Sequence, residues 1–249
     1  LQLFQVWAVI NKMNIAMKKN IFYIMLLLLT SAVSFTSCDD DSSAGVTSIT
    51  YYPVLTLKGD ATMYADKGAA FIDPGCAGEL NGEDISSQLV VTGTVNTAKS
   101  GIYTLTYSAT NADGFSASVS RTVIVTDPTD AKEGVFYTDA ANSYRDYSGN
   151  KAFGDNFEVI IINNGDGTYH VSDLLGGWYS QKAGYGSNYN MEGDVKFAED
   201  GTMTLLNSLI GGWGDSLVGF SGKFDAASSS YTWDAEYVSS MKFHVVLNK

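Results

Sequence analysis

The sequence predicts an all-β protein, in which a β-sandwich is followed by a second antiparallel domain that is either a β-barrel or a β-sandwich. Two observations predict this class. Apolar and polar residues alternate with a period of two in short runs, and Gly, Asn, Asp and Ser separate these runs. The sequence also lacks the long helical patterns that would supply the crossover connections of a parallel sheet.

The N-terminal segment has the order of an export signal that ends at a lipid-accepting cysteine. Two lysines precede an apolar core at 21–29, and small residues lead to Cys38, which three aspartates follow at once. A membrane-spanning helix needs about 20 predominantly apolar residues, but Ser and Thr dilute this segment. We therefore expect a signal peptide over 1–37, with Met17 as the true start and 1–16 as a misassigned extension.

The composition limits the possible partners. Cleavage before Cys38 removes three lysines but no acid, so the formal net charge changes from −12 to −15. Nucleic acid needs clusters of Lys and Arg, so we exclude it as a partner. The acids are scattered, which is typical of a solvated anionic surface. With Cys38 lipidated, Cys76 has no partner and no intramolecular disulfide is expected.

Two polar joints divide the exported chain. Residues 38–46 form a tether, and Asp127-Pro128-Thr129-Asp130 forms a second joint. All three prolines lie at or before the second joint, whereas three of the four tryptophans lie after it, so the two halves differ in construction. We predict a first domain over 47–128 and a second domain, rich in Trp and Tyr, over 131–249.

The first domain contains a clear hairpin pattern. Residues 101–109 place apolar and polar side chains on opposite faces, and 111–114 supply turn residues. The returning run at 119–125 places valines on one face, with Arg121 among them as the exception. This hairpin is expected to form one edge of a sandwich.

The same residues carry a resemblance to a known family. The segments 64–68 (YADKG), 71–75 (FIDPG), 101–114 (GIYTLTYSATNADG) and 121–125 (RTVIV) resemble the bacterial immunoglobulin-like domain of pesticidal crystal proteins and many surface proteins. The resemblance implies a spacer or a binding module and not a catalyst. Asn111 stands where that family often has Asp, which weakens any idea of an ion site there.

The second domain is predicted to consist of strands over its whole length. Its apolar and alternating runs are bounded by Gly, Asn, Asp and Ser, and seven or eight antiparallel strands imply a barrel or a sandwich. The predicted strands are 157–162, 169–175, 194–198, 203–209, 217–224, 231–238 and 241–247.

An internal repeat lies inside this domain. Residues 166–178 (DGTYHVSDLLGGW) recur at 200–213 (DGTMTLLNSLIGGW) with one residue inserted. Each copy predicts a turn, a strand and a Gly-Gly-Trp corner. This arrangement allows Trp178 and Trp213 to occupy equivalent places on neighbouring hairpins.

The Gly-Gly-Trp corners are the best candidates for a ligand site. Two glycines allow a sharp turn and leave room beside the ring, as an aromatic platform for a sugar or an apolar side chain requires. The alternative is that both tryptophans are core residues and that the glycines only turn strands. The predicted ligand-binding residues are Trp178, Tyr179, Tyr185, Tyr189, Trp213 and Asp215.

Metal and cofactor sites are not expected. The segment 163–167 (NNGDG) lacks the spaced oxygen ligands and the distal Glu of an EF-hand, so we predict a hairpin turn there. The two histidines, His170 and His244, lie in different predicted strands without a pair of free cysteines, so no transition-metal site is predicted.

Catalytic motifs are also missing. The chain has no Gly-x-Ser-x-Gly elbow, no His-Glu-x-x-His and no phosphate-binding loop. Two acids are the minimum for glycoside hydrolysis, and Asp234 with Glu236 or Asp155 with Glu158 would supply them. Such pairs arise by chance among 27 acids, so we predict a protein that is not an enzyme. A glycoside hydrolase using Asp234 and Glu236 is the least favoured alternative.

The whole arrangement resembles the two-domain lipoproteins found beside starch-utilisation-type outer-membrane transporters. The resemblance implies a lipid anchor in the outer membrane, with the aspartates after Cys38 directing the protein to the cell exterior. It also implies binding of a nutrient, either a glycan or an oligopeptide, and partnership with the transporter and its binding lipoprotein. The alternative is a structural or interaction lipoprotein that docks on the transporter and binds no small ligand.

Overall fold

The computed structural model describes residues 49–249. The predicted signal peptide, the lipidated Cys38, the aspartates that follow it and the tether at 38–46 therefore lie outside the described residues. Within 49–249, no helix has the length and apolar character needed to cross a lipid bilayer.

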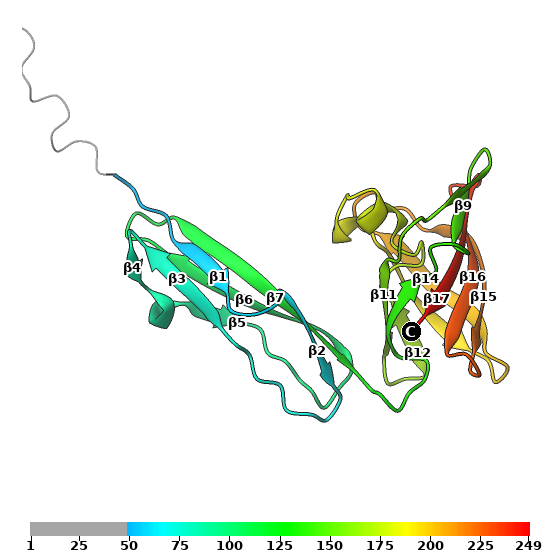
Figure 1. The fold of residues 1–249 in the computed structure, drawn as a ribbon, viewed down its shortest axis with the longest axis horizontal. Coiled ribbons are helices and arrows are strands. Elements are labelled where there is room, and N and C mark those ends of the chain that lie inside the picture. The colour runs from blue at the N-terminus through cyan, green and yellow to red at the C-terminus, as the bar shows by residue number, and fades with distance from the viewer. Residues whose placement is uncertain (1–48) are drawn as a thin grey trace, which may run out of the picture. The chain divides into compact units, whose positions relative to one another are not determined.

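The first domain consists of two small sheets, as the predicted sandwich requires (Figure 1). The predicted hairpin is present as β6 and β7, which pair from Gly101 opposite Val125 to Thr110 opposite Ser116. One sheet contains β1 (Val54–Leu57), β3 (Cys76–Leu80) and β4 (Glu83–Asp84), and the other contains β2 (Thr62–Asp66), β7 (Ser116–Thr126), β6 (Gly101–Thr110) and β5 (Val90–Thr92). A 3₁₀ turn, η1 (Ser86–Gln88), precedes β5.

Arg121 breaks the apolar pattern of β7 but is completely buried. Its guanidinium donates to the Asp73 carboxylate, and the Tyr107 hydroxyl donates to the same carboxylate. Its remaining donors reach backbone carbonyl oxygens, including that of Asp60 at 3.0 Å. Burial acts to raise the pKa of Asp73, but the donors of Tyr107, Gly75 and Arg121 outweigh it and lower the pKa. A buried charge is tolerated here because it is paired and fully hydrogen-bonded.

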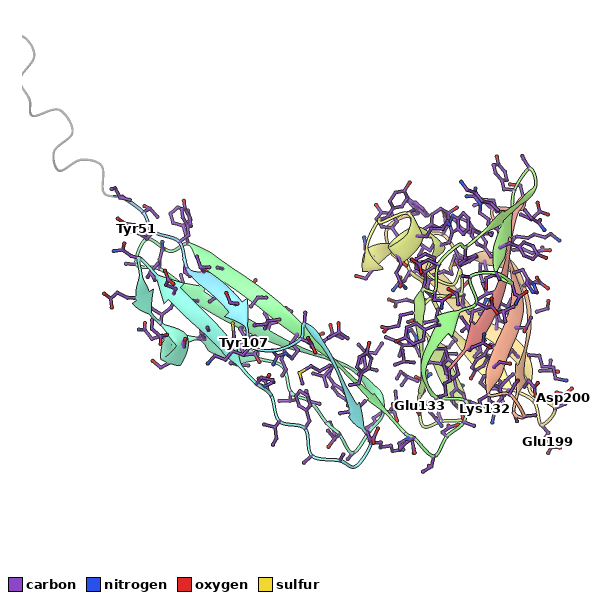
Figure 2. All side chains as sticks on the ribbon, viewed as in Figure 1. Tyr51, Tyr107, Lys132, Glu133, Glu199 and Asp200 are labelled. Atoms are coloured by element: carbon purple, nitrogen blue, oxygen red, sulfur yellow. The ribbon has the colours of Figure 1, made fainter. Side chains whose placement is uncertain are left out.

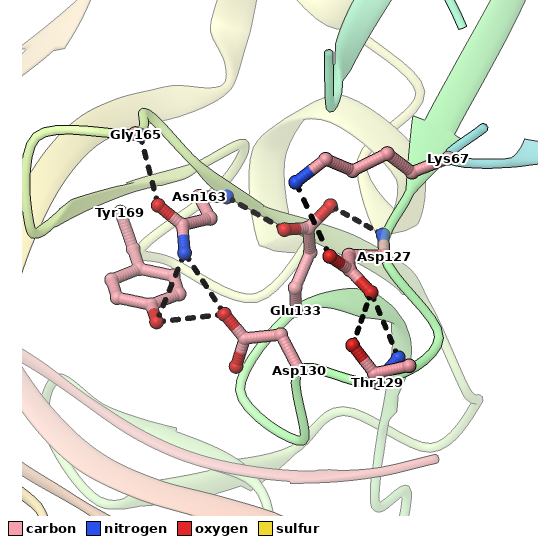
Figure 3. A network of polar contacts seen from close by, with 8 residues as sticks. All are labelled: Lys67, Asp127, Thr129, Asp130, Glu133, Asn163, Gly165 and Tyr169. Carbon is pink, nitrogen blue, oxygen red and sulfur yellow. Dashed lines mark hydrogen bonds and ion pairs between the residues drawn. The ribbon is translucent and has the colours of Figure 1, made fainter. Parts of the chain in front are cut away.

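The segment between the domains is held by carboxylates (Figure 3). Glu133 is buried, and its two oxygens accept hydrogen bonds from the backbone N–H of Asp127 at 2.9 Å and of Asn163 at 3.3 Å. Asp130 accepts from the Tyr169 hydroxyl at 2.8 Å and from the Asn163 amide at 2.9 Å. The joint predicted at 127–130 is therefore tied to the start of the second domain.

The second domain is a closed antiparallel barrel of eight strands. Of the two predicted alternatives, the barrel is therefore confirmed and the sandwich is not. The ring closes where Leu247 pairs with Thr138. The strands are, in order around the barrel, β8 (Gly134–Thr138), β11 (Glu158–Asn163), β12 (Thr168–Val171), β13 (Met191–Phe197), β14 (Thr202–Ile210), β15 (Leu217–Asp225), β16 (Ser230–Tyr237) and β17 (Met241–Asn248). The unpredicted hairpin of β9 (Tyr144–Asp146) and β10 (Asn150–Ala152) pairs with β17 beyond the closure.

Side chains fill the barrel, as expected for eight strands. The inward faces of the alternating strands supply a continuous apolar core that includes Phe136, Val159, Val195, Trp233 and Phe243. The indole N–H of Trp233 donates to the backbone carbonyl of Leu174 at 2.8 Å, so this buried polar group is satisfied.

The connections between strands gather at the two ends of the barrel. The helical end carries the connections 172–190, 211–216 and 238–240, including the short helices η2 (Trp178–Lys182) and η3 (Ser187–Tyr189) (Figure 1). The turn end carries the tight connections 164–167, 198–201 and 226–229. The segment 163–167 is a hairpin turn between β11 and β12, with Gly165 and Gly167 at positive φ.

Candidate functional site

A buried carboxylate shapes the first Gly-Gly-Trp corner at the helical end. Asp173 follows β12 and is 1% exposed. One carboxylate oxygen accepts from the backbone N–H of Leu175 at 2.9 Å and of Met191 at 3.3 Å, and the other accepts from the Ser180 hydroxyl at 2.9 Å. Burial raises the pKa of Asp173 to about 6 despite these donors. Asp173 thus ties the end of β12, the helix η2 and the start of β13 together.

Gly177 then starts the π-helix η2 with a left-handed conformation, at a φ of 81°. A Cβ at this position would lie 2.6 Å from the Cβ of Phe157, so only glycine fits without a shift. The helix directs Trp178 into the core, and the next residue, Tyr179, reaches the aromatic residues of the second corner.

Trp178 is buried, whereas a residue that stacks on a ligand must expose its ring. Its side chain is 4% exposed and packs edge-on against Phe153, with ring centroids 5.0 Å apart. The guanidinium of Arg145 lies 4.7 Å from the ring centroid and the ammonium of Lys182 lies 4.9 Å from it. These neighbours leave no open ring face, so Trp178 stabilises the corner through cation–π and edge contacts.

The second corner has a different structure from the first, so the two tryptophans are not equivalent. The backbone stays in strand β14 as far as Ile210 and then turns through Gly211 to Gly214. The ring of Tyr189 packs on Gly212, where a Cβ would lie only 2.5 Å from the Tyr189 ring. Trp213 consequently stands at the surface beside Tyr189.

Five aromatic residues form a continuous group that runs from the core to the surface, which we call the aromatic cluster: Tyr179, Tyr185, Tyr189, Trp213 and the buried Tyr237. Trp213 lies at its centre, with ring centroids 4.9 Å from those of both Tyr179 and Tyr189. The most exposed members are Tyr185, at 55%, and Trp213, at 41%. Edge-to-face contacts of this kind fix ring orientation and contribute about 0.5–1.5 kcal/mol each.

A carboxylate adjoins the aromatic cluster. The Tyr237 hydroxyl donates to Asp215 at 2.7 Å, and burial together with this hydrogen bond raises the pKa of Tyr237. Asp215 is half-buried, and one of its oxygens is the acceptor for Tyr237, which fixes the position of the side chain. The structure therefore brings all predicted ligand residues except Trp178 to one place. Tyr237 was not among them, although it ends the apolar face of its predicted strand next to the loops.

The turn end of the barrel carries a separate hollow of about 540 Å³. Figure 2 labels three of its lining residues, Lys132, Glu199 and Asp200. Charged residues of both signs line it, including Lys132, Asp200 and Lys223, and Phe224 also contributes to the lining. The Lys132 ammonium lies 5.7 Å from the Phe224 ring centroid. Strands β13 to β16 run between this hollow and the aromatic cluster, so it is not part of the candidate site.

The other residues that could carry chemistry are distributed over the outside of the barrel. The Asp234 carboxylate accepts a hydrogen bond from Nδ1 of His244 at 2.8 Å, and Glu236 pairs with Lys242 at 2.7 Å. His170 lies 3.3 Å from Asp194 on neighbouring strands. Over residues 49–249, no group of three or more His, Cys, Asp or Glu side chains is arranged to hold a metal ion.

Comparison with known proteins places this architecture in a family. A family model described as a bacterial surface protein Ig-like domain matches 55–125, and a second, described as a C-terminal domain, matches 125–249. The crystal structure of the lipoprotein BT2262 from Bacteroides thetaiotaomicron is 35% identical, with a TM-score of 0.70, over 80% of this chain and 100% of that chain. The chain belongs to the family of this lipoprotein. The immunoglobulin-like resemblance of the first domain is thereby confirmed.

Two further solved structures from Clostridium perfringens ZmpB share only limited likeness. One contains an M60 catalytic domain with the CBM51-1 and CBM51-2 domains, and it is 18% identical, with a TM-score of 0.27, over 49% of this chain and 14% of that chain. The other contains CBM51-2 in complex with GlcNAc and INT domains. It is 16% identical, with a TM-score of 0.25, over 79% of this chain and 44% of that chain. TM-scores this low support no conclusion about the fold or the function of this chain. A comparison with curated proteins finds no match.

Proposed function

We propose that this protein is a lipid-anchored bacterial surface protein that binds a nutrient, a glycan or an oligopeptide, on the aromatic cluster and performs no catalysis. Membership of the family of a lipoprotein supports the anchor at Cys38, and the surface-protein Ig-like model supports display outside the cell. The first domain then serves as a spacer, and the barrel acts as an accessory to a starch-utilisation-type transporter of the outer membrane.

The observation that carries the proposal is the exposure of Trp213 within a rigid aromatic surrounding. Leaving large apolar area in water costs about 25 cal/mol per Å², so an exposed tryptophan stabilises the free protein less than a buried one would. Tyr179 and Tyr189 nevertheless hold its ring from two sides, at interplanar angles of 86° and 63°. A preorganised aromatic surface beside the fixed carboxylate of Asp215 suits stacking combined with hydrogen bonding.

Calorimetric titration across a panel of polysaccharides and peptides tests the proposal. We expect Trp213→Ala and Tyr185→Ala to weaken binding at least 10-fold, because each removes an exposed ring from the cluster. Tyr51→Ala is the matched control, since Tyr51 is similarly exposed, at 45%, and belongs to the first domain. Unchanged affinity in the Trp213 variant would overturn the proposed site.

The alternative role, docking on the transporter without a ligand, predicts a different result. In that case no member of the panel produces heat, and the protein co-purifies with an outer-membrane transporter from detergent extracts even in the Trp213→Ala variant. Protease shaving of intact cells tests display on the exterior separately, because an inward-facing protein would survive the treatment.

A further inference from the structure

The backbone hydrogen-bond ladder of the barrel is interrupted between β14 and β15, directly beside the aromatic cluster. These strands pair at one end, where Met203 lies opposite Gly222, and again at the bridge between Ile210 and Asp215. Within the described part of the chain, no backbone ladder joins residues 204–209 to 216–221. We call these two facing segments the seam.

A side chain stands between the strands inside the seam. The Ser208 hydroxyl accepts a hydrogen bond from the backbone N–H of Leu217 at 2.9 Å, and the Ser216 hydroxyl donates to the backbone carbonyl of Ser208 at 2.6 Å. Backbone groups that would bond directly in a continuous ladder are thus bridged through hydroxyl groups. The rest of the seam has no ladder partner across the gap.

Both edges of the seam also carry a β-bulge. Leu206 is the extra residue where β14 pairs with β13, and Val218 is the extra residue where β15 pairs with β16. Both side chains are exposed, as is Leu209 on the same strand as Leu206. Bulges occur preferentially at sheet edges and next to functional sites, where they end pairing.

Core side chains are partly open to solvent at the same place. In the register that holds at both ends of the seam, Leu205 lies opposite Phe220, and both are only half-buried although they pack against the barrel core. The seam therefore presents apolar surface on its inner side, at Leu205 and Phe220, and on its outer side, at Leu206 and Val218.

We propose that the seam binds an extended peptide strand, so that the ligand of the protein is an oligopeptide. This inference rests on the proposed function and chooses between its two ligand classes. A peptide matches the seam because its alternating N–H and C=O groups repeat with the spacing of a strand edge, which sugar hydroxyls do not. Its alternate side chains then contact the inner and outer apolar residues.

The connection 211–216 joins the two edges of the seam and carries Trp213. Ser208 bridges the seam to Ser216 and Leu217, so its unbridged edges are 204–207 and 218–221. A strand advances about 3.3 Å per residue, so four residues span about 13 Å along these edges. One end of the peptide points toward this connection, and the aromatic cluster receives a side chain that extends past the Ser208 bridge. The seam and the cluster form one continuous site.

Hydrogen exchange of the intact chain provides the first test. We expect amides of 204–207 and 218–221 that face the seam to exchange at least 100-fold faster than the paired amides of β16 and β17. A nonapeptide selected from a random phage-displayed library should protect them on binding. Seam amides that are as protected as those of β16 in the free protein would overturn the inference, because the ladder between β14 and β15 would then be continuous.

The second test separates backbone pairing from aromatic contact. Fluorescence anisotropy should show at least 10-fold weaker binding of the selected peptide when alternate residues are N-methylated, because methylation removes the donors of one edge. Leu206→Lys and Val218→Lys should weaken binding similarly, since lysine blocks strand addition at sheet edges. Val90→Lys, on the exposed first-domain strand β5, is the matched control.

The outcomes distinguish this inference from the proposed function. A polysaccharide whose binding is lost in Trp213→Ala but unchanged in Leu206→Lys would support the aromatic cluster and overturn the seam. A library that yields no peptide also overturns the seam. A dimer in light scattering that Val218→Lys dissociates would assign the seam to a second copy of the chain and would again overturn the peptide.

Discussion

The buried Asp173 should make the stability of this protein depend on pH between 5 and 7. The pKa of Asp173 is raised to about 6 by burial, against 3.8 for the free side chain. The folded protein therefore holds this proton more tightly than the unfolded chain does. The associated stability is fully present below pH 4 and is lost as the pH rises through about 6.

The size of the effect follows from the same two pKa values. Their difference corresponds to about 3 kcal/mol over the full titration, because one pH unit is worth about 1.36 kcal/mol. Between pH 5 and pH 7, the free energy of unfolding should fall by about 1.3 kcal/mol from this residue alone. Asp173 is completely buried, so solvent screening does not reduce this figure appreciably.

Urea unfolding of the wild type and of Asp173→Asn across pH 5 to 7 measures this dependence. The wild type should lose stability relative to the variant as the pH rises. Asp166→Asn is the control, because Thr168 donors lower the pKa of Asp166 and its titration falls below this window. Equal slopes for the wild type and Asp173→Asn would refute the argument. If the variant unfolds, NMR titration of the Asp173 carboxyl carbon in the wild type gives the same information.

Two further substitutions test the packing of each domain. Asp73→Ala should destabilise the first domain by about 3–5 kcal/mol in urea, because it leaves the buried guanidinium of Arg121 without its carboxylate, and a loss below 1 kcal/mol would contradict this. Gly212→Ala should displace the ring of Tyr189 and change the near-ultraviolet circular dichroism of the aromatic cluster, at a cost of about 1–3 kcal/mol, whereas an unchanged spectrum would show that the ring has room to move.

The strands of the barrel could be predicted because each of them has one buried and one solvated face. The alternation in β16 and β17 places Trp233 and Phe243 inside, and the predicted bounds differ from the observed ones by at most one residue at either end. The strands β9 and β10 have three residues each, too few to establish a period. Closure of the barrel depends on Leu247 meeting Thr138, a contact between distant residues that no local pattern specifies.

The candidate site was predictable in composition but not in geometry. Turn glycines and neighbouring aromatic residues identified the two loops, and the structure brings Tyr185, Tyr189 and Trp213 together there. The sequence could not show that Trp178 is buried, because its burial depends on Arg145 and Phe153 from a segment with little recognisable pattern.

The repeat explains why the helical end has both a rigid base and an exposed surface. In the first copy, Asp173 replaces strand pairing with buried hydrogen bonds and turns Trp178 inward, so this corner becomes part of the core. When the two copies are aligned with the inserted residue placed after Asn207, Asn207 corresponds to Asp173. In this second copy the chain remains a strand as far as Ile210. Without a buried carboxylate to fold it back, this corner projects Trp213 outward. One motif thus supplies the support, and the other supplies the exposed surface that we propose as the ligand site.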